Sequence, residues 1–171
     1  SIDAGTVNGT ANEFGNGNDV LTTGSGRDMI FGGGGNDSID AYGSGGAPAS
    51  ADGNNIVFGD HGLVDYLAEE MAPAIPATPR RDTPSTRDID RVWSITTGMG
   101  GSDTIDTGNA NDIVFGGFAG DTINAGHGKN IVFGDAGRVT AANADDPLTQ
   151  WSVHEFTIGE IIGTAFADGG V

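Results

Sequence analysis

The feature that most constrains the fold is a nine-residue repeat. From residue 98 to residue 133 the chain reads GMGGSDTID, TGNANDIVF, GGFAGDTIN and AGHGKNIVF, which are four copies of one unit. Each copy carries an Asp or Asn that is followed two places later by an aliphatic residue, and glycines crowd the positions before it. A short fixed period of this kind predicts a solenoid, in which each unit packs only against its neighbours.

The same period occurs upstream. From Phe14 the chain reads FGNGNDVLT, TGSGRDMIF and GGGGNDSID. Asn55 then follows Asp37 after eighteen residues, so either a degenerate repeat fills residues 41–49 or one turn carries a loop. Aligning IVFGDHGLV at 56–64 with IVFGDAGRV at 131–139 favours the loop, and the Gly, Ala, Pro and Ser content of this segment agrees.

Composition limits what can hold such a chain together. It has 171 residues, 31 of them glycine, and a formal net charge of −17, and 19 of its 24 acidic residues are Asp. This charge disfavours nucleic acids and anionic membranes as partners, and no apolar run is long enough for membrane insertion. Because large apolar side chains are few and cysteine is absent, we expect a hard cation with oxygen ligands to supply cohesion.

The unit itself suggests how oxygen ligands are presented. Six residues of turn and three of strand return the chain to the same side of a roll every two units, so that turns two units apart stack. Glycine permits positive φ angles and close approach of the backbone, which lets carbonyl oxygens point inward. Carbonyls of two stacked turns, together with their Asp carboxylates, are a sufficient set of ligands for calcium.

The units match GGxGxDxUx, where U is a large aliphatic residue, and they resemble the calcium-binding nonapeptide repeats of RTX proteins. The resemblance implies a parallel β-roll with calcium ions between stacked turns, at about four sites or more. The implied pairs are Asp19 with Asp37 and Asp103 with Asp121 on one edge, and Asp28 with Asn55 and Asp112 with Asn130 on the other. The glycines assigned to these sites are Gly15, Gly17, Gly24, Gly26, Gly33, Gly35, Gly117 and Gly126. Pairs that contain Asn are expected to bind calcium more weakly.

Each block ends in an FGDxG element with an extra Asp. Asp60 and Asp135 occupy a position that is usually Gly in the repeats that this chain resembles. They are therefore candidate calcium ligands at the end of an array, or they are residues that only form the turn. Both interpretations remain open from the sequence.

After each FGDxG element the repeat stops and a non-repetitive segment follows. The first of these segments ends in WSI at 93–95, and the second ends in WSV at 151–153. We expect two β-hairpin arms, with strands near 63–67 and 89–95 and near 138–141 and 150–153, and a linker is the alternative. The predicted fold is all-β: a parallel β-roll, or β-solenoid, of two repeat blocks with protruding β-hairpin arms. Its expected divisions are a first block at 1–66, a Pro/Arg-rich arm at 67–92, a second block at 93–140, and a short arm with a cap or a further unit at 141–171.

One outer face of the predicted roll is apolar. The aliphatic residue two places after each Asp points inward, and its neighbours point outward because strand side chains alternate. One sheet then exposes Ile113, Phe115, Ile131 and Phe133, matched in the first block by Met29, Phe31, Ile56 and Phe58. A row of this kind is rarely left bare. We expect the arms, through Val92, Trp93, Trp151 and Val153, or else a neighbouring molecule or block, to cover it.

The sequence offers no catalytic constellation. His61, His127 and His154 are scattered, and repeated identical carboxylate pairs indicate structure rather than one active site. We therefore expect a non-enzymatic, calcium-dependent structural module of a large secreted RTX-like surface protein, such as an adhesin, S-layer or filament component, exported by type I secretion. Because the chain opens in the middle of a repeat, it is expected to be part of a longer protein.

Two other functions stay open at this stage. The Pro/Arg-rich arm could make the chain a ligand- or polysaccharide-binding module, and the repeats could be the secretion and folding tail of an RTX exoenzyme. The expected partners are calcium, neighbouring repeat blocks and, because both ends of the stack expose strand edges, further copies joined head to tail.

Overall fold

Strands make up all the regular structure that the computed structural model describes, which covers residues 17–43, 52–66, 89–95, 98, 100–141 and 158–164. These twelve strands form three sheets of four strands each. The all-β prediction is therefore confirmed for the described part. Within it, the structure contains no helix with the length and hydrophobicity that crossing a membrane requires.

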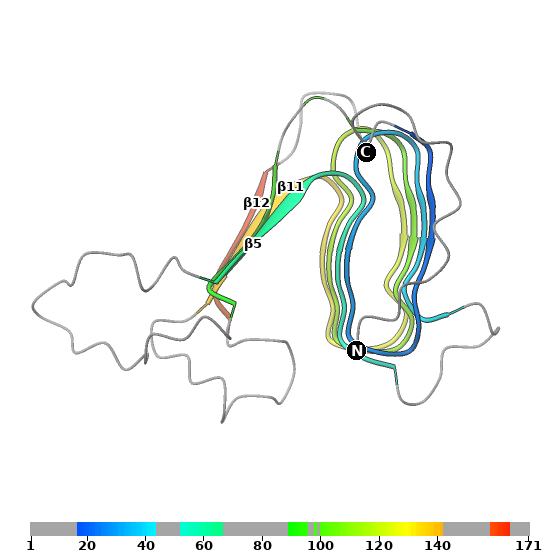
Figure 1. Cartoon of the computed structure of the whole chain (residues 1–171). Helices are drawn as coiled ribbons and strands as arrows, with labels where there is room; N and C mark the ends of the chain where they lie inside the picture. The colour runs from blue at the N-terminus through cyan, green and yellow to red at the C-terminus, as the bar shows by residue number, and fades with distance from the viewer. Residues whose placement is uncertain are drawn as a thin grey trace, which may run out of the picture.

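Two of the sheets are parallel and form the body of the molecule. The chain alternates between them, so that each coil adds one strand to each sheet, and Figure 1 shows the coils stacked with matching outlines. The first sheet has the order β1 (Val20–Thr22), β3 (Ser38–Asp40), β7 (Thr104–Asp106) and β9 (Thr122–Asn124). The second sheet has the order β2 (Met29–Phe31), β4 (Ile56–Phe58), β8 (Ile113–Phe115) and β10 (Ile131–Phe133).

The two repeat blocks join into one continuous stack. β3 pairs with β7, with Ile39 opposite Ile105, and β4 pairs with β8, with Val57 opposite Val114. β2 pairs directly with β4, which supports the loop between Asp37 and Asn55, although residues 44–51 of that loop lie outside the described part. The two blocks therefore meet within two continuous sheets, without a break in strand pairing between them.

The body encloses a narrow core of the predicted aliphatic residues. Ile30, Ile39, Val57, Ile105 and Val114 are buried together, and Leu21 and Ile123 pack against them partly buried. Each strand is only three residues long because glycine-rich turns begin on either side of a β-branched or aliphatic centre. At the last coil the equivalent residue, Val132, is 45% exposed.

The third sheet is antiparallel and brings the two predicted arms together. Its order is β12 (Ile158–Thr164), β11 (Ala136–Ala141), β6 (Arg91–Ser94) and β5 (Gly62–Asp65), and we call it the arm sheet. The strands predicted near 63–67 and 89–95 are confirmed as β5 and β6. The return strand predicted at 150–153 lies outside the described residues. Residues 158–164 form an edge strand on β11, and their expected role as a cap or the start of a further unit stays a prediction.

The arm sheet covers the apolar face of the second sheet, as one of our predictions states. Figure 1 shows it extending obliquely from one end of the coils. Ile56, Phe58, Ile113, Phe115 and Phe133 are buried in one cluster with residues of the arm sheet. The arm residues in this cluster are Val92, Val139 and Ala141, together with Ile89 just before β6. Trp151 and Val153, two other predicted contacts, lie outside the described part.

The covered face is a ladder of stacked rings. Phe31, Phe58, Phe115 and Phe133 stack with centroids 4.8, 4.8 and 4.7 Å apart and with interplanar angles of at most 9°. Gly62 and Gly137, the last residues of the two FGDxG elements, lie so close to the rings of Phe58 and Phe133 that a Cβ would come within 3.0 Å of them. These glycines let each arm leave the body flat against the ladder.

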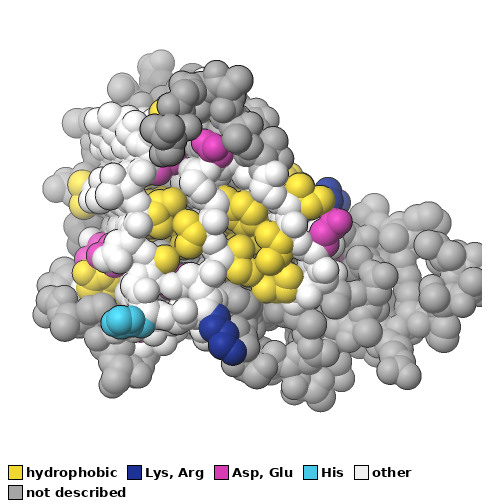
Figure 2. Space-filling model, turned by 180° about the vertical axis from the view of Figure 1, so that it is seen from behind, with side chains coloured by type: hydrophobic (Ala, Val, Ile, Leu, Met, Phe, Trp, Pro, Cys, Tyr) yellow, Lys and Arg dark blue, Asp and Glu magenta, His cyan; other side chains and the backbone are white. Residues whose placement is uncertain are grey.

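The cover is incomplete at the first coil. Met29 and Phe31 remain 43% and 44% exposed, although they belong to the same outward row. Trp93 is partly buried and does not belong to the cluster, and the guanidinium of Arg91 lies 4.6 Å from the centre of its ring. Figure 2 shows one face of the molecule on which hydrophobic side chains gather.

Candidate metal centre

The turns of the body lie along two edges, and one side-chain ladder runs along each. The first edge carries Asp19, Asp37, Asp103 and Asp121, and the second edge carries Asp28, Asn55, Asp112 and Asn130. On the first edge each backbone N–H donates to Oδ1 of the residue one coil further on, at 2.8, 2.7 and 2.9 Å. The second edge repeats this pattern at 3.0, 2.8 and 2.9 Å. The predicted pairs are therefore stacked, and the junction between the blocks adds Asp37 with Asp103 and Asn55 with Asp112.

A second ladder is formed by the residues just before these. Oδ1 of Asn18 accepts the N–H of Asn36, whose own Oδ1 accepts the N–H of Ser102. On the second edge, Oδ1 of Asn54 accepts the N–H of Asn111, whose Oδ1 accepts the N–H of Lys129. The repeat pattern GGxGxDxUx leaves this position unspecified. The recurrence of Asn directly before the Asp or Asn of the motif was the signal for it.

On the first edge the second carboxylate oxygen points into an oxygen-lined space. A Cβ on Gly59 would lie closer than 3.0 Å to Oδ2 of Asp103 and to the carbonyl oxygen of Gly116, which is one coil further on. The same holds at Gly116, where Oδ2 of Asp121 and the Gly134 carbonyl converge, and at Gly32, where Oδ2 of Asp37 and the Gly59 carbonyl converge. Each space lies between the first and sixth residues of one turn and the carbonyl of the first residue in the turn stacked on it, one coil further on.

Two of these carboxylate oxygens are desolvated without a hydrogen-bond donor, which is energetically unfavourable. Asp37 and Asp103 are buried, and Oδ2 of each accepts no hydrogen bond from the part of the chain that the structure describes. Burial raises the pKa of the Asp103 carboxyl to about 8, the N–H of Asp37 opposes this shift, and neighbouring carboxylates add to it. Burial likewise raises the pKa of Asp37. A desolvated carboxylate without a hydrogen-bond partner either retains a proton or binds a cation.

The second edge closes the equivalent space with its own side chains. Nδ2 of Asn55 donates to the carbonyl oxygens of Thr107, at 3.2 Å, and Ala41, at 3.4 Å. The hydroxyl of Thr107 donates to Oδ2 of Asp112 at 2.8 Å. In the last coil Nδ2 of Asn130 donates to the carbonyl of Ala125. At these places hydrogen-bond donors stand where the first edge has only acceptors.

Comparison with known proteins agrees with the motif. The family model described as RTX calcium-binding nonapeptide repeat (4 copies) matches residues 15–47, 97–121 and 108–140. These turns are RTX repeats. No curated protein and no solved structure matches the chain.

The first-edge turns fit the calcium that RTX repeats bind. Carboxylate and backbone carbonyl oxygens are the ligands that calcium prefers, and a bound ion would supply positive charge to the buried carboxylates. Asp37, Asp103 and Asp121 would hold it, together with the carbonyls of Gly59, Gly116 and Gly134. Within the described ranges no three acidic or His side chains gather into a metal cluster.

The glycines that matter most on the first edge were missed by sequence reasoning. Gly32, Gly59, Gly116 and Gly134 each follow a Phe directly, whereas the second-edge turns begin with Thr23, Ala41, Thr107 and Ala125. Among the predicted glycines, Gly33, Gly35, Gly117 and Gly126 have positive φ angles, so their role in the fold is conformational. The carbonyls of Gly17 and Gly26 face the glycines one coil further on, Gly24 lies in a described turn, and Gly15 lies outside the described residues.

Asp60 in the first FGDxG element fastens the next turns. Its Oδ1 accepts the N–H of Gly101 at 3.1 Å, and its Oδ2 accepts the N–H of Phe118. Burial raises its pKa to about 6, and these two hydrogen bonds oppose the shift. Asp60 therefore acts as a turn former, and its role as a calcium ligand stays a prediction, as does that of the partly buried Asp135.

Asp52 does the same on the second edge, which the sequence did not indicate. Its carboxylate accepts the N–H groups of Gly53, at 3.1 Å, and Asn109, at 3.0 Å. Burial raises its pKa, and these hydrogen bonds oppose the shift. The Asp52 carboxylate, near the end of the loop between Asp37 and Asn55, thus holds the turn of the following coil in place.

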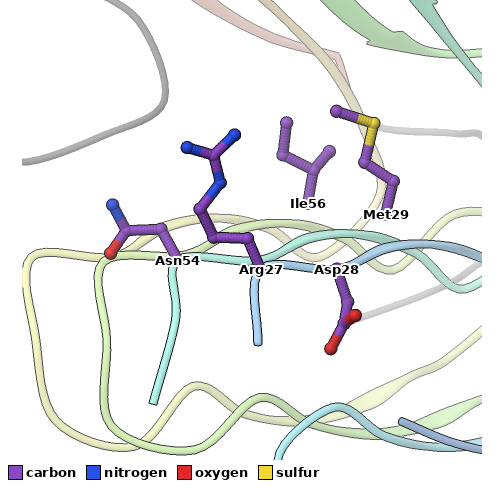
Figure 3. A pocket seen from close by; sticks show the side chains of 5 residues that line it. All are labelled: Arg27, Asp28, Met29, Asn54 and Ile56. Carbon is purple, nitrogen blue, oxygen red and sulfur yellow. The ribbon is translucent and has the colours of Figure 1, made fainter. Parts of the chain in front are cut away.

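A small pocket marks the second edge near the first coil. Its volume is about 40 Å³, and it is lined by Arg27, Asp28, Met29, Asn54 and Ile56. In Figure 3 the Asp28 carboxylate points to the opposite side from the other four side chains. A drug-sized ligand needs roughly 300 Å³ or more, so this pocket is too small for one.

Proposed function

We propose that this chain is a non-catalytic, calcium-binding structural module of a secreted RTX-type surface protein, in which the two parallel sheets form a β-roll that folds when calcium binds. The observation that carries the proposal is the Asp103 carboxylate. It is 1% exposed, its Oδ2 has no hydrogen-bond partner among the described residues, and it faces the Gly116 carbonyl of the next coil. Such a carboxylate stays ionised only beside a cation, and without one it takes up a proton.

The Asp103 site also explains why calcium would promote folding. Gly59 and Asp103 belong to one turn, but β5 and β6 of the arm sheet lie between them in the chain. An ion held there would join two segments that are far apart in sequence. Because ordering such segments costs chain entropy, binding free energy becomes folding free energy.

Net charge acts in the same direction. At −17 the chain repels itself, and each bound calcium ion reduces that repulsion. A chain of this kind would stay unfolded where calcium is scarce and fold where calcium is millimolar. This supports export in an unfolded state followed by folding outside the cell, where the module would serve as a spacer or surface element.

The test is circular dichroism of the chain in excess chelator and after addition of millimolar calcium, with magnesium at the same concentration as the control. We expect a strong β-sheet signal with calcium and a much weaker one in chelator at neutral pH. Magnesium should not replace it, because magnesium demands a tighter octahedral shell and dehydrates reluctantly. An identical β-sheet signal in chelator and in calcium would contradict the proposal.

A further inference from the structure

We propose that calcium binds in the first-edge turns, and that the three second-edge turns ending in Asn55, Asp112 and Asn130 are closed without metal by the side chains of Asn55, Thr107 and Asn130. This inference rests on the proposed function, because it concerns which RTX turns of this chain take the ion. It departs from the repeat pattern, which assigns a site to both edges alike.

The argument begins with the position of the Asn55 amide. On the first edge, Oδ2 of Asp103 faces the Gly116 carbonyl of the next coil across a shared space. On the second edge the same place is taken by Nδ2 of Asn55, which donates to the Thr107 carbonyl at 3.2 Å and to the Ala41 carbonyl at 3.4 Å. An NH₂ group supplies two donors, so it satisfies two carbonyls that would otherwise be cation ligands.

The next coil is closed in a different way. Asp112 keeps the carboxylate of the motif, and it is fully buried. Unlike Asp103, it accepts a hydroxyl hydrogen bond from Thr107 to Oδ2 at 2.8 Å, and its Oδ1 accepts the N–H of Asn55 at 2.8 Å. Both carboxylate oxygens therefore have partners within the protein, and the demand for a cation is removed.

The last coil repeats the first device. Nδ2 of Asn130 donates to the Ala125 carbonyl, while its Oδ1 accepts the N–H of Asp112 at 2.9 Å. Each Asn thus preserves the stacking ladder through Oδ1 and replaces the cation through Nδ2. The residue types agree with this division, because the first-edge turns ending in Asp37, Asp103 and Asp121 begin with Gly, and these second-edge turns begin with Ala or Thr.

Asp28 is outside this inference. Its Oδ2 is buried and has no hydrogen-bond partner, so this turn retains the character of the first edge. The test therefore compares matched substitutions rather than relying on a total number of ions.

The matched pair is Asp103→Asn and Asp112→Asn, two buried residues at the same position of the repeat on opposite edges. Both substitutions keep an Oδ1 that accepts the N–H of the preceding coil. Calcium ions per chain are counted by native mass spectrometry and by titration calorimetry. We expect Asp103→Asn to lose one ion and Asp112→Asn to lose none. Loss of one ion in Asp112→Asn would overturn the inference.

The reverse substitution, Asn55→Asp, tests the same idea by gain. It should add one calcium ion per chain and should increase the amount of calcium needed for half-maximal folding, because it replaces two N–H donors with a carboxylate oxygen. An unchanged ion count with an unchanged calcium requirement would count against the inference. If the wild-type chain bound no calcium at all, the proposed function itself would fail, and that result is distinguishable from a failure of the division between edges.

Discussion

The two edges of the body are made from one repeat unit and hold their turns together by different means. On the first edge Oδ2 of Asp37 and Oδ2 of Asp103 lie buried next to backbone carbonyls, and nothing in the described part donates a hydrogen bond to these two oxygens. On the second edge Asn55 and Thr107 supply donors at the corresponding places. The comparison teaches that a repeat can retain its backbone stacking while one amide or hydroxyl donor supplies the hydrogen bonds that are missing on the other edge.

The strongest way to break the comparison is Gly59→Ala. A Cβ there would fill the space between Asp103 and the Gly116 carbonyl, so we expect both the calcium site and the local stacking to be lost. Overpacking of this kind costs about 1–3 kcal/mol before the loss of calcium is added. Thermal unfolding in calcium and in chelator measures the effect, and the calcium-induced gain in stability should shrink markedly.

Gly120→Ala is the matched control for that change. It lies in a first-edge turn, it is exposed, and a Cβ on it would meet nothing within 4 Å. We expect its calcium response to equal that of the wild type. Equal damage from both substitutions would show that the first edge tolerates no side chain anywhere, and that the space at Gly59 has no special role.

The pH dependence of stability in the calcium-free protein should distinguish Asp103 on the first edge from Asp112 on the second. The pKa of Asp103 is raised from 3.8 to about 8, and that of Asp112 to about 6, in both cases mainly by burial. A raised native pKa means that the folded state binds more protons, so stability falls as pH rises from about 4 toward the folded-state value. We expect the calcium-free chain to gain stability on acidification from pH 8 to pH 5.

Substitution of each Asp by Asn shows which carboxyl group causes this pH dependence. Asp103→Asn should flatten the slope of stability between about pH 6 and 8, whereas Asp112→Asn should flatten it only between about pH 4 and 6. In the presence of calcium the upper part of the slope should disappear, because the ion competes with the proton for Asp103. A calcium-free stability that rises from pH 5 to pH 8 would contradict the assignment.

A smaller effect is expected at Thr107. Thr107→Val removes the hydroxyl that donates to Oδ2 of Asp112 and leaves a buried oxygen without its donor. Such a loss costs about 1–3 kcal/mol. Denaturant unfolding in calcium measures it. Thr23→Val is the control at the same position of the repeat, because the Thr23 hydroxyl has no hydrogen-bond partner, and its loss should cost much less.

The smallest effect belongs to the feature that the edges share. Asn36→Ala removes the acceptor for the Ser102 N–H on the first edge, and Asn111→Ala removes the acceptor for the Lys129 N–H on the second. Each should cost about 0.5–1.5 kcal/mol, by similar amounts with and without calcium. Chemical denaturation of both variants checks this. A calcium-dependent cost at Asn36 alone would mean that its ladder contributes to the metal site.

Much of the arrangement followed from the repeat period. The register placed Ile39, Ile105 and Val114 in the core, and it set Phe115 and Phe133 in an apolar row that required cover. The pairing of Asp37 with Asp103 could not be derived in the same way, because 66 residues separate them and the arm between them has no repeat. Nor did the sequence show that both arms share one sheet, since the pairing of β6 with β11 depends on where the body places their bases.

The sequence by itself determined an all-β, glycine-rich stack with RTX turns on two edges, because a nine-residue unit with alternating strand side chains leaves little freedom in backbone path. Only the tertiary structure decided which turns need a cation. An Asp and an Asn at the sixth position look like strong and weak versions of one ligand when they are read along the chain. In space, Nδ2 of Asn55 reaches the carbonyl of Thr107 on the next coil, whereas Oδ2 of Asp103 meets another oxygen-bearing turn. Hydrogen bonding between coils, which no local pattern encodes, gives the carboxylate of Asp112 and the amides of Asn55 and Asn130 their partners, and it leaves Oδ2 of Asp37 and Asp103 without a donor among the described residues.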